Sequence, residues 1–562
     1  MKKAPVREFT ALQSFKHLLS LMSERDKTVY ISPVGKEYVS LSYKDFADMA
    51  LRMTAGIAAV GLAGKRVAVI GETSPEWVAT YIGVVAAGGV IIPMDKELAT
   101  EEIEGFLTGA EAEAIVYSKS FNQKLAHAIE AHPTLKLFIP MSPAEGVENE
   151  KILPLAAVLE KGAAALAEGY TVPDRDPDAM STMLFTSGTT GTSKCVMLCE
   201  RNIVTSVNAA CASVDFSEAD TTVSVLPLHH TYELTIMMAK LTLGMTVGIN
   251  DSLRHIMRNF AAIKPTGLVL VPLFVNTMYK KIWDEAKKKG KDQLLRKMAS
   301  VANKLKLPRA VRRKLFASVI SAFGGRLEKI ICGGAALNPE MVKGFNTFGI
   351  QICEGYGITE CSPLIAVTPY WAPKRGSVGP AVPNCTARIA AQGTNDKGYD
   401  EGEIQVVGGN VMLGYYKNDA ANADAFTEDG WYRTGDIGYM DEDGYIYITG
   451  RLKSVIVLEN GKNVFPEEIE EYLENIEEIA ECVVVGRKGE DGETVNLTAV
   501  VYPQKDLFDE GVEQEVIYKA IYEKITALNR ELPSFKKIKG LELRDEEFEK
   551  TTSRKIKRHL VK

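Results

Sequence analysis

Residues 183–196 read MLFTSGTTGTSKCV, in which the apolar pair Leu184 and Phe185 precedes a run of small, hydroxylated or glycine residues and Lys194 follows it. Glycines accept positive φ and let successive N–H groups turn towards one point, and hydroxyls add donors, so such a loop can hold an anion beside the lysine. It departs from a Walker A loop, because Gly188 and Gly191 are three residues apart and Cys195 follows the lysine. Taken alone, the segment fits a flexible linker as well as a phosphate site.

Short apolar runs with polar flanks recur on both sides of this loop. They read RVAVIGE at 66–72, AEAIVYS at 112–118 and TGLVLVP at 266–272, with helical patterns such as EWVATYIGVVAAG at 76–88 between them. Buried strands that alternate with helices predict an α/β architecture with largely parallel sheets.

The pattern changes near residue 375. From GEIQVVG at 402–408 to YIYITG at 445–450 the chain reads as short strands joined by tight turns. Asp443-Gly444, between alternating apolar residues, is the strongest short signal for a β-hairpin. We therefore expect a small antiparallel β subdomain over about residues 376–450.

A second change follows residue 450. PEEIEEYLENIEEI at 466–479 predicts an amphipathic helix with Pro466 in its first turn. Its apolar stripe consists of Ile469, Leu473, Ile476 and Ile479. ECVVVG at 481–486 and VNLTAVVYP at 495–503 predict strands. Residues 451–562 are therefore expected to form a small α+β domain.

Composition excludes several classes of protein. The chain has 562 residues, 46% hydrophobic and 25% charged, with a net charge of -7, which argues against a nucleic-acid binder. Eight cysteines without C-x-x-C spacing indicate free thiols in a reducing cytoplasm. The longest apolar run, 82–94, is too short to span a bilayer, so no transmembrane segment is expected. Lys16 and His17 interrupt the N-terminal segment, so no signal peptide is expected either.

One segment departs from the overall acidity. Residues 280–314 contain fourteen Lys or Arg against three Asp or Glu, a net charge of +11, which leaves -18 for the remainder. A solvated helical face is the ordinary interpretation. The functional alternatives are docking to an anionic membrane surface or to an acidic carrier protein.

Other segments of the chain help to decide between a linker and a phosphate site for this loop. FTSGTTGTSK at 185–194 resembles the phosphate-loop signature of the adenylate-forming (AMP-binding) superfamily, which includes acyl-CoA synthetases, luciferases and peptide-synthetase adenylation domains. Further segments resemble motifs of that family in its order: LPLHH (226–230), GGAAL (333–337), YGITE (356–360), YRTGD (432–436), GRLK (450–453) and TTSRKIKR (551–558). The resemblance covers the chain from about residue 70 onwards, and six or seven ordered matches are far more specific than one.

The resemblance implies the domain organisation. A large N-terminal adenylate-forming domain, 1–450, would combine two parallel-type α/β sheets with a small β-barrel subdomain at about 376–450. A small mobile α+β lid domain, 451–562, would follow. The loop departs from the family pattern P-K-G by carrying Ser193 and Cys195, and Arg554 stands where the family commonly has glycine.

The resemblance also implies a nucleotide site. Glu360 would hold Mg²⁺ through its carboxylate, Asp436 would accept the ribose hydroxyls, and Tyr356 would face adenine. Each has an ordinary structural alternative, namely a surface pair, a turn aspartate or a core aromatic. The residues implied to bind ATP or AMP are Thr186, Ser187, Gly188, Thr189, Thr190, Gly191, Lys194, Gly334, Ala335, Ala336, Tyr356, Gly357, Thr359, Asp436, Ile448, Arg451 and Lys555.

Catalytic roles follow by the same resemblance. Lys555 would bridge the acyl carboxylate and the phosphate oxygens, a role that suits a point charge on a flexible stem. His230 would line the carboxylate side and control acyl access, with His229 as an unresolved competitor. Thr186 and Glu360 complete the implied catalytic set. Lys453 would be the hinge, Gly461 and Lys462 would line the pantetheine path, and the acyl pocket would contain His230, Thr231, Tyr232 and Phe274.

The segments VPLFVNTMYKKIW (271–283) and GGRLEKIICGGAALNPEM (324–341) resemble long-chain fatty acyl-CoA synthetases. We therefore expect an acid–thiol ligase that uses ATP and Mg²⁺ to activate a fatty acid as acyl-adenylate and transfers it to CoA. A fatty acyl carrier protein ligase is the alternative. A non-enzymatic membrane or nucleic-acid binder built on 280–314 is a remote third. A cytoplasmic location is expected, and peripheral contact with a membrane is left open as an alternative.

Overall fold

The computed structural model describes residues 9–142, 149–186, 194–458, 463–488, 495–509, 511–550 and 556–561. The chain forms two compact units. The first consists of residues 1–386 with 406–432, and the second of residues 387–405 with 433–562.

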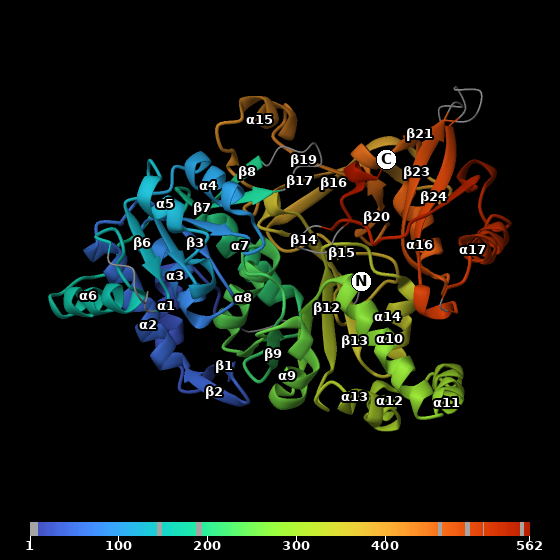
Figure 1. Ribbon diagram of the computed structural model, residues 1–562, viewed down its shortest axis with the longest axis horizontal. Helices are drawn as coiled ribbons and strands as arrows, with labels where there is room; N and C mark the ends of the chain where they lie inside the picture. Colours follow the sequence, from blue (N-terminus) through green and yellow to red (C-terminus); the bar gives the residue numbers. More distant parts are fainter. Residues whose placement is uncertain are drawn as a thin grey trace. The chain divides into compact units, whose positions relative to one another are not determined.

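The largest sheet of the first unit has seven strands in the order β18-β8-β7-β4-β3-β5-β6. Its five strands from β7 to β6 are parallel, and β8 and β18 are added antiparallel at one edge. The strands are β3 (Arg66–Ile70), β4 (Val90–Met94), β5 (Ala114–Tyr117), β6 (Leu137–Pro140), β7 (Met180–Thr186), β8 (Lys194–Cys199) and β18 (Gly414–Tyr415). Figure 1 labels α4 (Thr100–Gly109) and α5 (Ala126–Ala131) beside it, and both pack their apolar side chains on this sheet.

Two four-stranded sheets complete the frame of the first unit. One has the order β2-β1-β10-β9 and the other β11-β12-β13-β14. Their edges meet where Thr266 N donates to Thr221 O at 2.8 Å, so they continue one another as a second α/β layer. The strands are β1 (Thr28–Val34), β2 (Glu37–Ser42), β9 (Thr221–Ser224), β10 (Thr246–Ile249), β11 (Gly267–Leu270), β12 (Lys329–Gly333), β13 (Gln351–Gly357) and β14 (Leu364–Val367).

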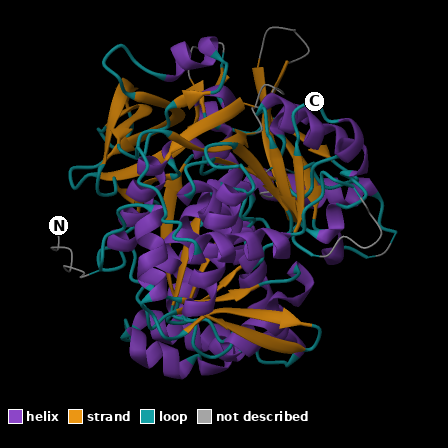
Figure 2. Ribbon diagram, turned by 90° about the vertical axis from the view of Figure 1, so that its left-hand side faces the viewer, coloured by secondary structure: helices purple, strands orange, loops and turns teal. Residues whose placement is uncertain are grey.

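Helices pack around these sheets, as the purple and orange ribbons of Figure 2 show. Several begin at the expected signals: α3 has Pro75 in its first turn and Ser74 as a cap that accepts from Trp77 N at 3.2 Å. The helices of the first unit are α1 (Phe15–Ser23), α2 (Tyr43–Ala59), α3 (Pro75–Ala86), α6 (Leu155–Ala167), α7 (Glu200–Ser213), α8 (Thr231–Leu243), α9 (Ile256–Ile263), α10 (Pro272–Lys288), α11 (Asp292–Lys304), α12 (Arg309–Leu315), α13 (Ala317–Ser321), α14 (Pro339–Thr347) and α15 (Asp419–Ala425).

The second unit contains an antiparallel β region and a small α+β region. Strands β16 and β17, which begin or end in the first unit, pair with β19 and β20 in the order β20-β19-β17-β16. The predicted hairpin is confirmed, with Gly444 at φ 81° between β19 and β20. The strands are β16 (Cys385–Thr394), β17 (Asp400–Gly408), β19 (Tyr432–Met440) and β20 (Tyr445–Arg451).

The C-terminal part of this unit has a three-stranded sheet in the order β23-β24-β25 with α16 and α17. The bounds are α16 (Pro466–Leu473), β23 (Ile479–Lys488), β24 (Val495–Pro503), α17 (Gln514–Leu528) and β25 (Gly540–Leu543). The helix predicted for 466–479 is therefore too long, because Ile479 opens β23 and pairs with Pro503. The proposed domain boundary after residue 450 stays a prediction.

Two expectations from composition can be compared with the structure. All eight cysteines are free and buried, as expected for reduced thiols. Among the helices of the described residues, none combines the length and the apolar character needed to cross a membrane.

Candidate active site

The carboxyl ends of β12 and β13 bring two predicted nucleotide segments together. These strands are parallel neighbours with Gly333 opposite Gly355. The exposed residues 334–336 follow β12, and the short turn Thr359–Cys361 follows β13. In open α/β sheets, ligands bind in crevices at the carboxyl ends of strands. Gly334, Ala335, Ala336, Gly357 and Thr359 therefore lie at one edge of this sheet.

Gly333 permits a close approach between three elements at this edge. A Cβ atom there would lie 2.9 Å from Gly355 O and 3.2 Å from the Tyr232 hydroxyl. Any other residue would push α8 or β13 away. Tyr356, the proposed adenine-facing residue, is a buried residue of β13 and therefore packs in the interior of the protein.

Glu360 belongs to a cluster at the end of the phosphate loop. The Tyr415 hydroxyl donates to Glu360 Oε1 at 2.8 Å and lies 3.3 Å from the Tyr432 hydroxyl. Lys194 Nζ lies 4.6 Å from the centroid of the Tyr415 ring, a cation–π distance. The structure thus joins the lysine of FTSGTTGTSK to the glutamate of YGITE through one aromatic ring.

Burial raises the pKa of Tyr415, and the negative charge of Glu360 raises it further. The phenol therefore stays neutral and keeps donating its proton to the carboxylate. Sequence reasoning missed Tyr415, because it follows no recognised motif. Its position comes from the antiparallel pairing of β18 with β8, where Tyr415 lies opposite Val196 across 219 residues of chain.

Thr186 and Lys194 face each other at the mouth of the loop. They are register partners of β7 and β8, and Thr186 Oγ1 donates to Lys194 O at 3.3 Å. The predicted phosphate-binding residues between them lie outside the described residues: Ser187, Gly188, Thr189, Thr190 and Gly191.

The two histidines of LPLHH occupy different positions. His229 Nε2 lies 3.3 Å from Asp95 Oδ2, so its ring is directed to the loop after β4. His230 precedes α8 as its cap residue, and its ring centroid lies 4.1 Å from that of His229. The distance to Asp95 distinguishes the two rings, and the assignment of His230 to the acyl side stays a prediction.

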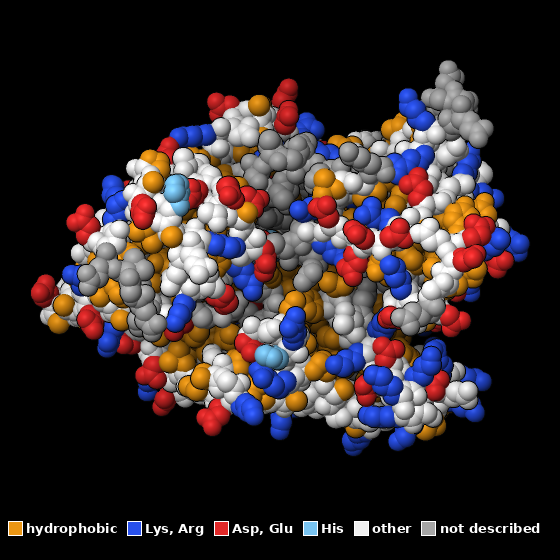
Figure 3. Space-filling model, in the orientation of Figure 1, with side chains coloured by type: hydrophobic (Ala, Val, Ile, Leu, Met, Phe, Trp, Pro, Cys, Tyr) orange, Lys and Arg blue, Asp and Glu red, His pale blue; other side chains and the backbone are white. Residues whose placement is uncertain are grey.

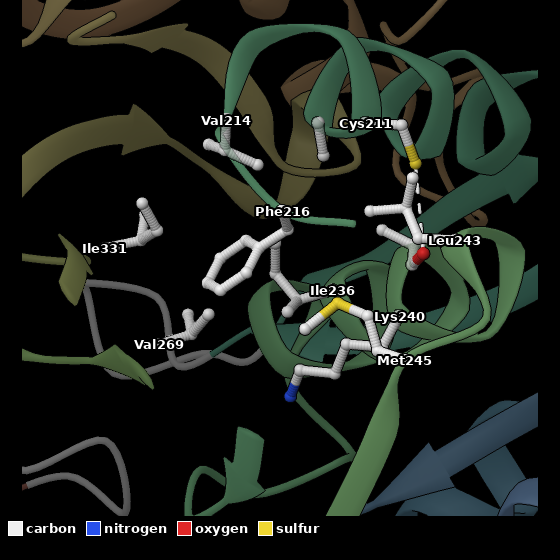
Figure 4. Close-up of a pocket in the computed structure, with 11 residues that line it drawn as sticks. Cys211, Val214, Phe216, Ile236, Lys240, Leu243, Met245, Val269 and Ile331 are labelled. Carbon is white, nitrogen blue, oxygen red and sulfur yellow. Dashed lines mark hydrogen bonds between the residues drawn. The ribbon is translucent and has the colours of Figure 1, made fainter. Parts of the chain in front are cut away.

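A small apolar cavity lies along α8, beyond Tyr232. Its volume is about 20 Å³, room for little more than one water molecule. Figure 4 shows its lining side chains, with Lys240 along one edge. They are Ala210, Cys211, Val214, Phe216, Ile236, Ala239, Lys240, Leu243, Met245, Val269 and Ile331. Thr231 is buried at the start of α8, whereas Phe274 packs partly buried against the core below β11 and β12.

Asp436 and Arg451 form a pair in the second unit. They are register partners of β19 and β20, and Arg451 Nε lies 2.8 Å from Asp436 Oδ1. Asp436 is buried, and its backbone N donates to Thr434 Oγ1 at 3.1 Å. Ile448 is exposed on β20, and Lys453 is exposed in the turn after it. Gly461, Lys462 and Lys555 lie outside the described residues.

No group of three or more His, Cys, Asp or Glu side chains suited to a metal is found where the structure describes the chain. Glu360 offers one carboxylate beside a cation and a neutral phenol. Mg²⁺ commonly takes one or two carboxylates and completes its octahedron with waters and substrate phosphates. The donor set therefore fits a metal that arrives with a nucleotide.

Comparison with known proteins identifies the family. The AMP-binding enzyme family matches residues 20–416, and the AMP-binding enzyme C-terminal domain matches residues 453–562. Mouse long-chain-fatty-acid–CoA ligase 6 is 30% identical over 95% of this chain and 81% of its own length. Long-chain-fatty-acid–CoA ligase FadD15 of Mycobacterium tuberculosis is 29% identical over 82% of this chain and 78% of its own.

Solved structures agree with the fold. ATP-bound MatB from Rhodopseudomonas palustris covers 98% of both chains with a TM-score of 0.74 and 25% identity. The Mycobacterium tuberculosis fatty acyl CoA synthetase matches 97% of this chain and 96% of its own, with a TM-score of 0.64 and 21% identity. With a family match over most of its length, the chain belongs to the AMP-binding enzymes.

Proposed function

We propose that the protein is an ATP-dependent ligase that joins a long-chain fatty acid to the thiol of CoA, with release of AMP and pyrophosphate. The observation that carries this proposal is the cluster of Lys194, Tyr415 and Glu360 at the end of the phosphate loop. A cation beside a carboxylate is the combination that phosphates and an accompanying metal require, which supports the proposal. The names of the relatives support the acid and the acceptor.

The proposed reaction has two steps. A carboxylate oxygen of the fatty acid attacks the α-phosphorus of ATP, the bond to the β-phosphate breaks, and pyrophosphate leaves with the electron pair. The thiol sulfur then attacks the acyl carbon, the carbon–oxygen bond to AMP breaks, and the thiol proton passes to solvent. Both steps need positioning and charge neutralisation more than proton transfer by the protein.

Each side chain has a proposed part in these steps. Lys194 attracts the β- and γ-phosphates, and Glu360 holds the Mg²⁺ that accompanies ATP. His230 lies on the acyl side, and Thr186 begins the phosphate loop. Asp436 binds the ribose hydroxyls, for which its paired Arg451 must release or share the carboxylate.

The second step requires the C-terminal region to present a thiol. We assign the hinge to Lys453 and the pantetheine path to Gly461 and Lys462, because a few torsions at an exposed turn can reorient a small domain. An acyl carrier protein, which bears the same phosphopantetheine thiol, is the alternative acceptor. The buried free thiols support a reducing cytoplasmic location.

Exchange of pyrophosphate into ATP tests the first step. The purified protein with Mg²⁺ should exchange label only when a fatty acid is present. Adding CoA or a carrier protein then shows which one becomes acylated. Absence of exchange with every carboxylate from short to long chains would rule out the enzyme proposed here, whereas acylation of the carrier protein alone would change only the acceptor.

The acyl chain is proposed to extend past Tyr232 into the cavity of Figure 4. On β12, Gly333 contacts Tyr232 and Ile331 lines the cavity, and these residues share one face because they are two apart. On α8, Ile236 is four residues beyond Tyr232 and also lines it. The cavity is therefore proposed to extend from Tyr232 further into the protein. A long acyl chain would enter it once the lining side chains move.

Ile236→Phe should shorten the accepted acid, because the added ring fills the cavity. Each methylene that loses burial costs about 0.8 kcal/mol, so displacing two or more lowers kcat/KM for long chains by at least about tenfold. Short acids should keep their rate, and Ile236→Val serves as the control that leaves the space open. A chain-length series measured by pyrophosphate exchange checks this, and an unchanged ratio of long to short acids would place the acyl tail elsewhere.

A further inference from the structure

We propose that the outward face of α11 and α12 docks on a membrane surface that carries anionic lipids. This basic apolar face is defined by eight residues: Leu294, Lys297, Val301, Lys304, Leu305, Val311, Lys314 and Leu315. The proposal goes beyond the ligase reaction and does not depend on it.

The helix α11 carries two apolar stripes, and only one of them is buried. Leu295, Met298, Ala299 and Ala302 pack against the core beneath β11 to β13. A second stripe points outward: Leu294, Val301 and Leu305 are 56%, 53% and 65% exposed. Their spacing of seven and four residues places them in one row. An amphipathic helix needs only the inner stripe to fold, so the outer row requires another explanation.

The same arrangement continues on α12. Val311 and Leu315, four residues apart, are 46% and 38% exposed. Phe316, the next residue, is fully buried in the core, so α12 also divides into an inner and an outer apolar side. Five branched aliphatic side chains thus lie exposed within 22 residues of sequence, more than the scattered apolar residues of an ordinary surface.

Lysines accompany these apolar residues at a fixed interval. Lys297 follows Leu294 by three positions, Lys304 follows Val301, and Lys314 follows Val311, so each cation lies beside an apolar side chain on the helix surface. Within the described part of the chain, no carboxylate lies within ion-pair distance of these three lysines. Figure 3 shows blue Lys and Arg side chains gathered at the lower right, where Figure 1 places α11.

The inner cations of this segment have structural roles instead. Arg312 donates to Leu307 O at 2.7 Å and to Asn303 Oδ1 at 2.7 Å. Arg313 donates to Leu327 O at 2.6 Å and lies 3.6 Å from Glu328. Within 280–314, Arg312 and Arg313 therefore hold the helices together and Lys288 and Lys289 lie near Glu285, whereas Lys297, Lys304 and Lys314 remain for an external partner.

The combination of exposed aliphatic side chains and lysines indicates which kind of partner this face binds. Helices that lie in a lipid interface combine a row of aliphatic side chains with flanking lysines, because the first enter the acyl boundary and the second meet anionic headgroups. An acidic carrier protein or a nucleic acid would use the lysines but give no reason for the exposed leucines and valines. A purely solvated face would explain the lysines but would give no reason for the exposed aliphatic row.

Binding of the full-length protein to vesicles tests the proposal. We expect sedimentation with vesicles of phosphatidylcholine plus phosphatidylglycerol, and about tenfold weaker binding to phosphatidylcholine alone. Lys297→Glu with Lys304→Glu and Lys314→Glu should lose that preference. Leu294→Ser with Val301→Ser and Leu305→Ser should weaken binding about tenfold even at high salt, where the charge contribution is screened. A control triple variant carries Lys36→Glu, Lys161→Glu and Lys488→Glu, exposed lysines outside the face.

Each of the following results supports or overturns membrane docking by this face. Loss of binding in both face variants, with binding kept in the control, supports the proposal. Equal binding of the serine variant and the unaltered protein would overturn it, as would equal loss in the control. Binding to an acidic carrier protein without binding to vesicles would overturn it in favour of that partner. Circular dichroism confirms folding, and pyrophosphate exchange with a water-soluble short acid should be unchanged, so a failure here is distinct from a failure of the ligase reaction.

Discussion

Lys555→Ala is expected to lower fatty-acid-dependent exchange of pyrophosphate into ATP by about 10³-fold, because removing one charge-stabilising donor from a transition state commonly costs about 10²- to 10³-fold. The attacking carboxylate and the α-phosphate are both anionic, and a cation between them offsets their repulsion. Lys555 lies outside the described residues, so the prediction rests on the segment TTSRKIKR.

The described neighbours of this segment are anchored to the second unit. Lys550 forms ion pairs with Glu481 and Glu547, and an antiparallel bridge joins it to Ile556. Arg558 pairs with the buried Glu470, and burial raises the pKa of Glu470 to about 7. Lys557→Ala, two positions away, is therefore the matched control and should keep its exchange rate. Exchange that survives in Lys555→Ala would remove this lysine from the adenylation step.

A contrasting variant separates the two half-reactions. Lys453→Pro should leave exchange largely intact and stop thioester formation, because proline fixes φ at the proposed hinge. Lys453 is exposed in a short turn, so the substitution disturbs little packing. Both variants should lose acyl-CoA formation from the free acid, because the second step consumes the adenylate, and only Lys555→Ala should also lose pyrophosphate exchange. Loss of both half-reactions in Lys453→Pro would argue against a hinge at this position.

Local sequence patterns were sufficient to predict strands of the α/β sheets. The runs at 66–72, 112–118 and 266–272 became β3, β5 and β11, since strands buried on both faces need uninterrupted apolar residues. The helix predicted for 466–479 ran too far, because the spacing of Ile476 and Ile479 fits a helix while the pairing of Ile479 with Pro503 decides for a strand. Local periodicity does not contain that pairing.

The geometry of the candidate site could be predicted from the sequence less well than the strands of the α/β sheets. Motifs supplied Lys194 and Glu360 but gave no distance between them, and Tyr415, which links them, belongs to a two-residue strand whose partner is far away in the chain. The contact that distinguishes His229 from His230 likewise comes from Asp95, 134 residues before His229. Contacts between segments distant in sequence determine these points, and no motif records them.

Glu360→Gln is the second variant with a large expected effect. The substitution keeps the shape of the side chain and its acceptor oxygen for Tyr415, but removes the negative charge that would hold Mg²⁺ beside the phosphates. We expect exchange to fall about 10²-fold, as for loss of a charged group that acts mainly in the transition state. The concentration of Mg²⁺ needed for half-maximal exchange should rise as well.

Tyr415→Phe is the matched control for this substitution, since it removes the hydroxyl while keeping the ring beneath Lys194 and the charge of Glu360. Loss of one hydrogen bond to a charged group corresponds to about 1.5–3 kcal/mol at most, and here water can replace the donor. Exchange in Tyr415→Phe should therefore fall by less than about tenfold, with an unchanged Mg²⁺ requirement. If the two variants instead lost equal activity and shared one Mg²⁺ dependence, the carboxylate would act only by holding Tyr415 and Lys194 in place, and the metal would have to be bound elsewhere.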